Sequence, residues 1–185
     1  LQNWYQTAKD YDPLQSKTVS SDWRFMADIQ HQFATRADWC ITPKYEDANH
    51  TPSLTIAEGL DFEAAPGQKL TFHAKTSDPD GDYVAVNWEH YFEADTYQEP
   101  EANKGIYIKG AESDTATITV PEDAKNGDTI VLNVRATDNG THSLSYYQQI
   151  VITVAGRTEL GNLSLTSGLQ DDTIVYGDPK QGWGG

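Results

Sequence analysis

The chain has 185 residues, enough for one domain with attached segments. Asp and Glu number 28 against 13 Lys and Arg, which gives a formal net charge of −15 at pH 7. Such a surface repels phosphate backbones and anionic lipid, so neither nucleic acid nor a membrane is expected as a partner, whereas calcium, neutral sugars and basic proteins are compatible. The single cysteine, Cys40, excludes an internal disulfide, so the fold must rely on its core or on a bound metal.

The first part of the chain divides into two segments. Residues 1–18 are polar and aromatic without a clear period, and we interpret them as a linker or the end of a missing N-terminal module. Residues 19–44 are predicted to form an amphipathic helix and a connector, with Ser20 or Ser21 as the helix cap and Pro43 preventing continuation. The helix is predicted from apolar residues at three- and four-residue spacing, namely Trp23, Met26, Ala27, Phe33, Ala34, Ala37 and Cys40. Such a helix needs an apolar surface, either the domain that follows or a removed neighbour.

From about residue 52 to 155 the hydrophobic period changes to two, which indicates strands. Strands are predicted near 53–57, 69–75, 83–92, 105–109, 115–120, 129–137 and 145–154, separated by turn signals such as Pro66-Gly67 and Asn126-Gly127. Seven short strands of this kind are typical of a mainly β protein with an immunoglobulin-like β-sandwich, as in polycystic-kidney-disease and cadherin-like domains, here over 45–156. Residues 157–185 are interpreted as a C-terminal extension or tail, with edge strands considered at 163–165 and 173–176.

One side of each predicted strand is consistently apolar. Trp88 lies where such sandwiches bury a tryptophan on their third strand, so we expect it in the core. The expected inward residues are Leu70, Phe72, Ala74, Val84, Val86, Trp88, Ile118, Val120, Ile130, Leu132, Val134, Ile150, Ile152 and Val154.

Three carboxylates crowd into the turn between the second and third predicted strands. These are Asp78, Asp80 and Asp82, in a Ser-Asp-Pro-Asp-Gly-Asp run. The loop carrying Asp138 and the entry carrying Asp47 are expected at the same pole of the sandwich. Calcium takes six to eight oxygen ligands in flexible geometry, so a structural calcium ion is one hypothesis for this pole. The alternative is a solvated turn in which each Asp accepts backbone N–H groups.

The outward side of the same strands carries tyrosines beside amide, carboxylate and guanidinium groups, a combination suited to sugar rings and their hydroxyls. The alternative is that the helix packs on this face and buries the tyrosines. The candidate carbohydrate-binding residues are Tyr83, Asn87, Glu89, Tyr91, Tyr97, Arg135, Tyr147 and Gln149.

No catalytic constellation is predicted. The five His residues show no metal-binding spacing, and no nucleophile motif occurs. Two carboxylates among Glu89, Glu93 and Asp95 would in principle act on a glycosidic bond, but nothing in the sequence fixes their separation.

Four segments taken in order carry a family resemblance: 25–40, 48–52, 77–82 and 88–97, the last with Trp88, Tyr91, Glu93 and Tyr97 in the pattern Trp-x-x-Tyr-x-Glu-Ala-x-Thr-Tyr. Together they resemble the C-terminal part of a bacterial family of cellulose-binding proteins whose N-terminal module resembles nucleoside hydrolases. The similarity covers about residues 20–155 and gives no support to residues 156–185.

The resemblance implies a domain that is secreted, periplasmic or at the cell surface and is associated with polysaccharide degradation. It also implies that the domain has been separated from a hydrolase-like module, which holds the presumed catalytic acids. The leading hypothesis is a non-catalytic module for cellulose or a related β-glucan. The alternative is an accessory domain that contacts the hydrolase-like module through Trp23, Phe33 and Trp39. An independent glycoside hydrolase is a third hypothesis.

Overall fold

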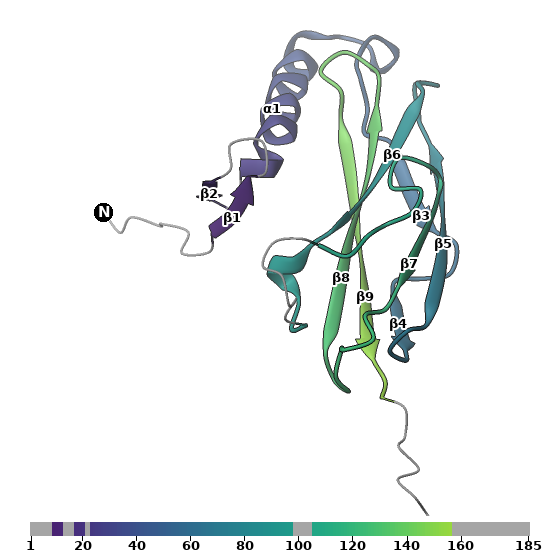
Figure 1. Cartoon of the computed structure of the whole chain (residues 1–185). Helices are drawn as coiled ribbons and strands as arrows, with labels where there is room; N and C mark the ends of the chain where they lie inside the picture. The colour runs from purple at the N-terminus through teal and green to yellow at the C-terminus, as the bar shows by residue number, and fades with distance from the viewer. Residues whose placement is uncertain (1–8, 13–16, 21–22, 98–104, 157–185) are drawn as a thin grey trace, which may run out of the picture.

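The computed structural model describes residues 9–12, 17–20, 23–97 and 105–156, and it shows two β-sheets packed face to face (Figure 1). The three-stranded sheet has the order β3-β5-β7 and the four-stranded sheet the order β4-β9-β8-β6. Their strands are β3 (Ser53–Ile56), β4 (Asp61–Ala64), β5 (Lys69–Ser77), β6 (Val84–His90), β7 (Thr115–Thr119), β8 (Thr129–Asp138) and β9 (Ser145–Val154). The fold is therefore a mainly β, immunoglobulin-like sandwich preceded by a helix, as the strand periodicity predicted.

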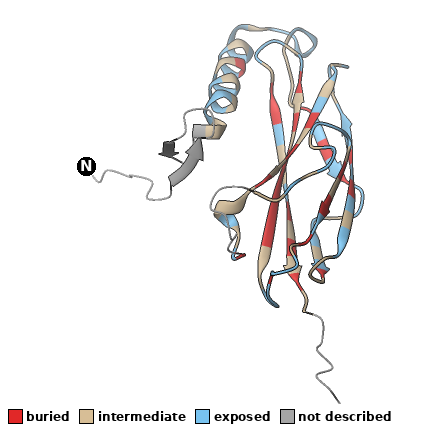
Figure 2. Ribbon diagram, viewed as in Figure 1, coloured by how far each residue is buried: buried red, intermediate tan, exposed pale blue. Residues whose placement is uncertain are grey.

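The core lies between the two sheets and contains the inward residues predicted from the alternation. Phe72, Ile118 and Ile130 are fully buried, and the ring of Trp88 stacks on Phe72 at 6.2 Å between centroids. The Nε1 hydrogen of Trp88 is donated to the Ser113 carbonyl at 2.7 Å, so this polar atom is satisfied inside the core. Figure 2 shows the buried residues concentrated along β8 and β9. The expected inward set is confirmed, with Leu70 and Val84 at its partly buried margin.

One strand prediction is wrong, and one strand was not predicted. The segment near 105–109 forms no strand and makes only an isolated bridge between Lys109 and Thr117. The seventh strand is instead β4, which pairs in parallel with β9 from Asp61 opposite Val151 to Ala64 opposite Val154. The sequence of β4, Asp-Phe-Glu-Ala, is short and half polar, so its period is too brief to reveal a strand. The edge strands considered at 163–165 and 173–176 lie outside the described residues.

The helical region begins later than predicted. Helix α1 spans Met26–Ile41 and follows a short 3-10 helix, η1 (Trp23–Phe25). Ser20 is not its cap, because Ser20 ends β2 (Lys17–Ser20), which pairs antiparallel with β1 (Lys9–Asp12) where a linker was expected; Ser21 lies outside the described residues. The cap position is Phe25, which provides no side-chain hydrogen bond. Among the described residues, no helix is long and apolar enough to cross a membrane.

Candidate functional site

The N-terminal end of α1 lies on the outer face of the four-stranded sheet, where the tyrosines point. Arg24 of η1 binds the carboxylates of Glu89 and, at 2.5 Å, Glu93. Its guanidinium carbon lies 5.3 Å from the ring centroid of Tyr91, within the range of a cation–π interaction. The Phe25 ring makes edge-to-face contacts with the rings of Tyr91 and Tyr147, at 6.2 Å and 5.6 Å between centroids. The helix therefore covers part of the face that the sequence offered to sugars.

A second set of polar contacts closes the same interface. Asp28 accepts a hydrogen bond from the hydroxyl of Tyr147 and one from Arg135 at 3.4 Å. Burial and the neighbouring Asp28 carboxylate raise the pKa of Tyr147, because both disfavour the phenolate. Glu89, Arg135 and the Tyr147 hydroxyl thus contact the helix segment, as the alternative of a helix-covered face predicts, while the side chains of Glu89 and Arg135 stay 42% and 40% exposed.

The helix also follows the end of the β8–β9 hairpin. His31 Nδ1 lies 3.1 Å from the Ser143 carbonyl, and the hydroxyl of Thr35, the buried residue of α1, donates to the His142 carbonyl at 3.4 Å. Near the helix end, Trp39 Nε1 donates to the Asn49 carbonyl at 2.9 Å. These contacts fix α1 across the pole that holds the acidic turn (Figure 1).

The remaining sugar-binding candidates are scattered. Tyr83 is exposed and lies before β6 without lining the groove described below, and Asn87 stands opposite Arg135 in the β6–β8 ladder. Tyr97 is only 7% exposed and donates its hydroxyl to Asp123 at 3.0 Å, so its expected exposure is wrong. Gln149 is exposed on β9, opposite Asn133.

A groove of about 550 Å³ remains between α1 and the sheet. Its volume is within the range of small-ligand sites, about 300–1,000 Å³. Three candidates from the sequence line it, Tyr91, Tyr147 and Gln149. The other lining residues are Phe25, Asp28, Ile29, Gln32 and Asn133. Those on α1 were missed because nothing in the sequence shows which helix face meets which strand.

Three carboxylates named as candidates for acid–base chemistry are also engaged. Glu89 and Glu93 share Arg24. Asp95 accepts the Val131 N–H at 2.6 Å with one oxygen, and its other oxygen lies 2.6 Å from His90 Nε2. Each carboxylate therefore holds together parts of the fold that are distant in sequence.

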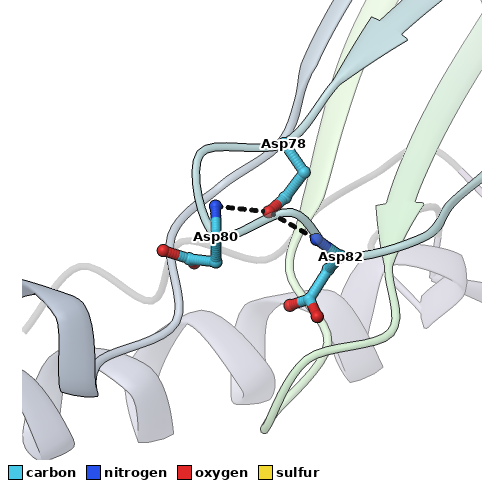
Figure 3. A group of neighbouring side chains, drawn as sticks. All are labelled: Asp78, Asp80 and Asp82. Atoms are coloured by element: carbon cyan, nitrogen blue, oxygen red, sulfur yellow. Dashed lines mark hydrogen bonds between the residues drawn. The ribbon is translucent and has the colours of Figure 1, made fainter.

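The acidic turn brings Asp78, Asp80 and Asp82 together, each with a carboxylate oxygen within 4.8 Å of the others (Figure 3). Asp78 Oδ1 accepts the backbone N–H groups of Asp80 at 2.8 Å and Asp82 at 3.2 Å, which shapes the turn. Partial burial and repulsion from Asp78, Asp138 and Asp80 raise the pKa of Asp82. The turn thus combines the solvated-turn geometry with a concentration of negative charge.

Two further candidate metal ligands occupy different positions. Asp138 is buried, and its carboxylate accepts the N–H groups of Gly140 and Leu144 at 3.0 Å each as well as the Asn49 amide at 3.3 Å. Asp47 lies exposed in η2 (Tyr45–Asp47) and is not part of the Asp78–Asp80–Asp82 group, which corrects its inclusion. From the segment between η2 and β3, Asn49 rather than Asp47 lies at the acidic turn.

The residues at this pole fit a hard cation. Asn49 Oδ1 and Asp78 Oδ2 are buried atoms with no hydrogen-bond partner. A Cβ on Gly140 would lie 2.4 Å from Asn49 Oδ1 and 2.5 Å from Asp82 Oδ2, so these oxygens approach the same small space. Carboxylate and amide oxygens are the donors that calcium prefers. Asp78, Asp82 and Asn49 are the residues that would hold such an ion, with Asp80 beside them.

The fold and its helix-covered sheet define an immunoglobulin-like sandwich. Residues 69–154 match the family described as cellulose-binding protein Sde0182, C-terminal domain, which confirms the resemblance noted in the sequence. No protein with a curated description matches the chain.

Among solved structures, the chain is similar to a nucleoside hydrolase-related hypothetical protein from Saccharophagus degradans that is associated with carbohydrate metabolism. The identity is 31% and the TM-score 0.65, over 71% of this chain and 32% of that protein. This chain thus corresponds to about a third of that relative. A PKD domain from KIAA 1837 protein is more distant, at 23% identity and a TM-score of 0.39, over 56% of this chain and 87% of that domain.

Proposed function

We propose that this chain is a non-catalytic carbohydrate-binding domain of a larger protein and that the groove between α1 and the four-stranded sheet holds a β-linked glucan such as cellulose. The observation that carries the proposal is the lining of this groove. Aromatic rings of Tyr91 and Tyr147 stand beside the amides of Gln32, Asn133 and Gln149. Aromatic rings offer apolar surface to sugar C–H groups, and an amide both donates to and accepts from hydroxyls.

Charge supports a neutral polymer as the ligand. The net charge of −15 repels anionic polysaccharides, and the carboxylate in the groove, Asp28, is already bound to Tyr147 and Arg135. The matched family is described as cellulose-binding, and cellulose is a neutral polymer of this kind. We place the parent protein outside the cytoplasm, as secreted, periplasmic or surface-attached, because an insoluble glucan is met there.

Retention on insoluble cellulose tests this proposal. The full chain is expected to bind, and the double substitution Gln32→Ala with Gln149→Ala to weaken binding about tenfold, because both amides are exposed and line the groove. Tyr83→Ala is the matched control, since Tyr83 is exposed and does not line the groove. Lack of retention of the unaltered chain would overturn the function. Equal retention of the double variant would overturn the groove as its location.

A second candidate function is an accessory domain that packs on a hydrolase-like module. The observation favouring it is an unpartnered strip of α1, where Ile29 is 53% and Phe33 is 77% exposed one turn apart. The Saccharophagus degradans relative is nucleoside hydrolase-related and extends well beyond the part that this chain covers. This function predicts no retention on cellulose, and it predicts that Phe33→Asp lowers the melting temperature of the hydrolase-like module in the full-length parent.

We also propose that the acidic turn holds a structural calcium ion. Its support is the pair of unpartnered buried oxygens, Asn49 Oδ1 and Asp78 Oδ2, beside the carboxylate of Asp82. A divalent cation would reduce the repulsion among the carboxylates and satisfy both orphaned oxygens. The ion would stabilise the turn, and no part of the sugar contact in the groove depends on it.

A further inference from the structure

A second hollow, of about 470 Å³, lies at the C-terminal end of α1. Three aromatic rings line it: Trp39, Tyr45 and His50. Trp39 is 43% exposed and Tyr45 is 68% exposed, which is high for such large side chains. No sugar-binding candidate from the sequence lines this hollow, and it shares no lining residue with the groove on the sheet face.

The three rings are close to parallel. Tyr45 stacks on His50 with 3.6 Å between centroids and 18° between planes. Trp39 and His50 are 5.8 Å apart at 22°. Two of the rings are also held at their polar edges, since Trp39 Nε1 donates to the Asn49 carbonyl at 2.9 Å and His50 Nδ1 lies 2.9 Å from Asp80 Oδ1. Exposed rings fixed in this way lose little conformational freedom when a ligand stacks on them.

The charges around the hollow favour a neutral ligand. Lys44 lines it and opposes a cation, while the overall charge of −15 opposes an anion. A hexose is neutral, has an apolar face that suits an aromatic ring, and carries hydroxyls that reach polar groups at the edge, such as Thr42 and Lys44.

The hollow is also in line with the groove. Gln32 lines the groove and Trp39 lines the hollow, and residues seven apart lie on nearly the same side of an α-helix. Their separation along the axis is about 10 Å at 1.5 Å per residue. One short oligosaccharide would therefore reach both.

We propose that Trp39 and Tyr45 form a second sugar-binding subsite, on which one hexose ring of a β-linked glucan stacks. This inference rests on the proposed function and adds to it a location that the outward tyrosine face does not include. Polymer binding at two subsites strengthens attachment without requiring either to bind tightly alone.

Calorimetric titration of the full chain with a soluble cello-oligosaccharide of six units tests the subsite. Trp39→Ala and Tyr45→Ala are each expected to weaken binding about tenfold. Tyr45→Phe should bind like the unaltered chain, because it keeps the ring. Tyr107→Ala is the matched control, since Tyr107 is exposed and lines neither cavity. Circular-dichroism melts of all variants separate lost binding from lost folding, and Tyr45→Ala is the cleaner probe because its ring is the more exposed.

The outcomes distinguish the two proposals. If the unaltered chain binds and both alanine variants bind equally well, the subsite is overturned while the carbohydrate-binding function stands. If the alanine variants lose binding and the groove double variant does not, the subsite is supported and the groove is not the site. If the unaltered chain binds neither the oligosaccharide nor cellulose, both proposals fail.

Discussion

His50 and Asp80 are joined at two points: the His50 backbone N–H donates to Asp80 Oδ2 at 2.6 Å, and His50 Nδ1 lies 2.9 Å from Asp80 Oδ1. Asp80 belongs to the acidic turn between β5 and β6. His50 precedes β3, and its ring stacks on the ring of Tyr45. The contact therefore ties the acidic turn to the aromatic hollow.

Asp80→Ala should lower the free energy of unfolding by about 1–3 kcal/mol, because the partly buried His50 N–H loses an acceptor that carries charge. Urea titration with a chelator present measures this cost without any contribution from an ion. The control is Glu112→Ala, which removes an exposed carboxylate elsewhere and should change stability little. Identical unfolding midpoints for the two variants would show that the His50–Asp80 contact does not stabilise the fold.

Arg24→Ala should loosen the N-terminal end of α1 from the sheet. The substitution leaves Glu89 and Glu93 near each other without the shared guanidinium and removes the contact with the Tyr91 ring. We expect a loss of about 1–3 kcal/mol, between the values for exposed and buried ion pairs. Hydrogen exchange of the α1 amides should become faster, while exchange in β8 should not change.

Arg36→Ala provides the control for this prediction, because Arg36 is an exposed arginine on the same helix. If the Arg24 and Arg36 variants show the same exchange in α1, the ion pairs do not hold the helix on the sheet.

The inner faces of the strands were predictable because the pleat repeats every two residues, so each strand reveals its own buried side. The cluster of Asp78, Asp80 and Asp82 was predictable for a similar reason, since one short turn contains all three. Asn49 is separated from this turn by three strands, β3, β4 and β5, and joins it only through tertiary structure. Asp47, two residues earlier, instead lies in η2 and is exposed, which no local pattern indicates.

The covering of the tyrosine face was predictable only as one of two alternatives. Tyrosines beside Glu89 and Arg135 suit a sugar or a helix equally well, because both supply apolar surface with polar groups around it. Arg24 and Glu89 are 65 residues apart in the chain, and the sequence around either residue does not indicate that the two form an ion pair. The outward tyrosines therefore serve two purposes: parts of their surfaces hold the helix, and the rest line a groove.

Trp88→Phe should lower the free energy of unfolding by about 1–3 kcal/mol. The smaller ring leaves space in a core where Trp88 is almost fully buried, and it leaves the Ser113 carbonyl without its donor. Urea unfolding followed by far-ultraviolet circular dichroism gives the midpoint. Tyr107→Phe, at an exposed site, is the comparison and should unfold close to the unaltered chain. An unchanged midpoint for Trp88→Phe would contradict the core role assigned to this residue.

Calcium should raise the melting temperature of the chain, and a chelator should reverse the effect. An ion at 100 times its dissociation constant adds about 2.7 kcal/mol to the folded state if it does not bind the unfolded chain. For a chain of this length each kcal/mol corresponds to about 2–4 °C.

Gly140→Ala should abolish the calcium-dependent shift although it removes no ligand, because the new Cβ would occupy the space that Asn49 Oδ1 and Asp82 Oδ2 approach. The quantity compared is the shift between calcium and chelator within each variant, so any strain from the added methyl group cancels. Thr141→Ala, at the next residue, should keep the full shift because the Thr141 carbonyl that Asn49 binds is unchanged. Equal melting temperatures of the unaltered chain with calcium and with chelator would refute the ion. A full shift in Gly140→Ala would place the ion away from this space.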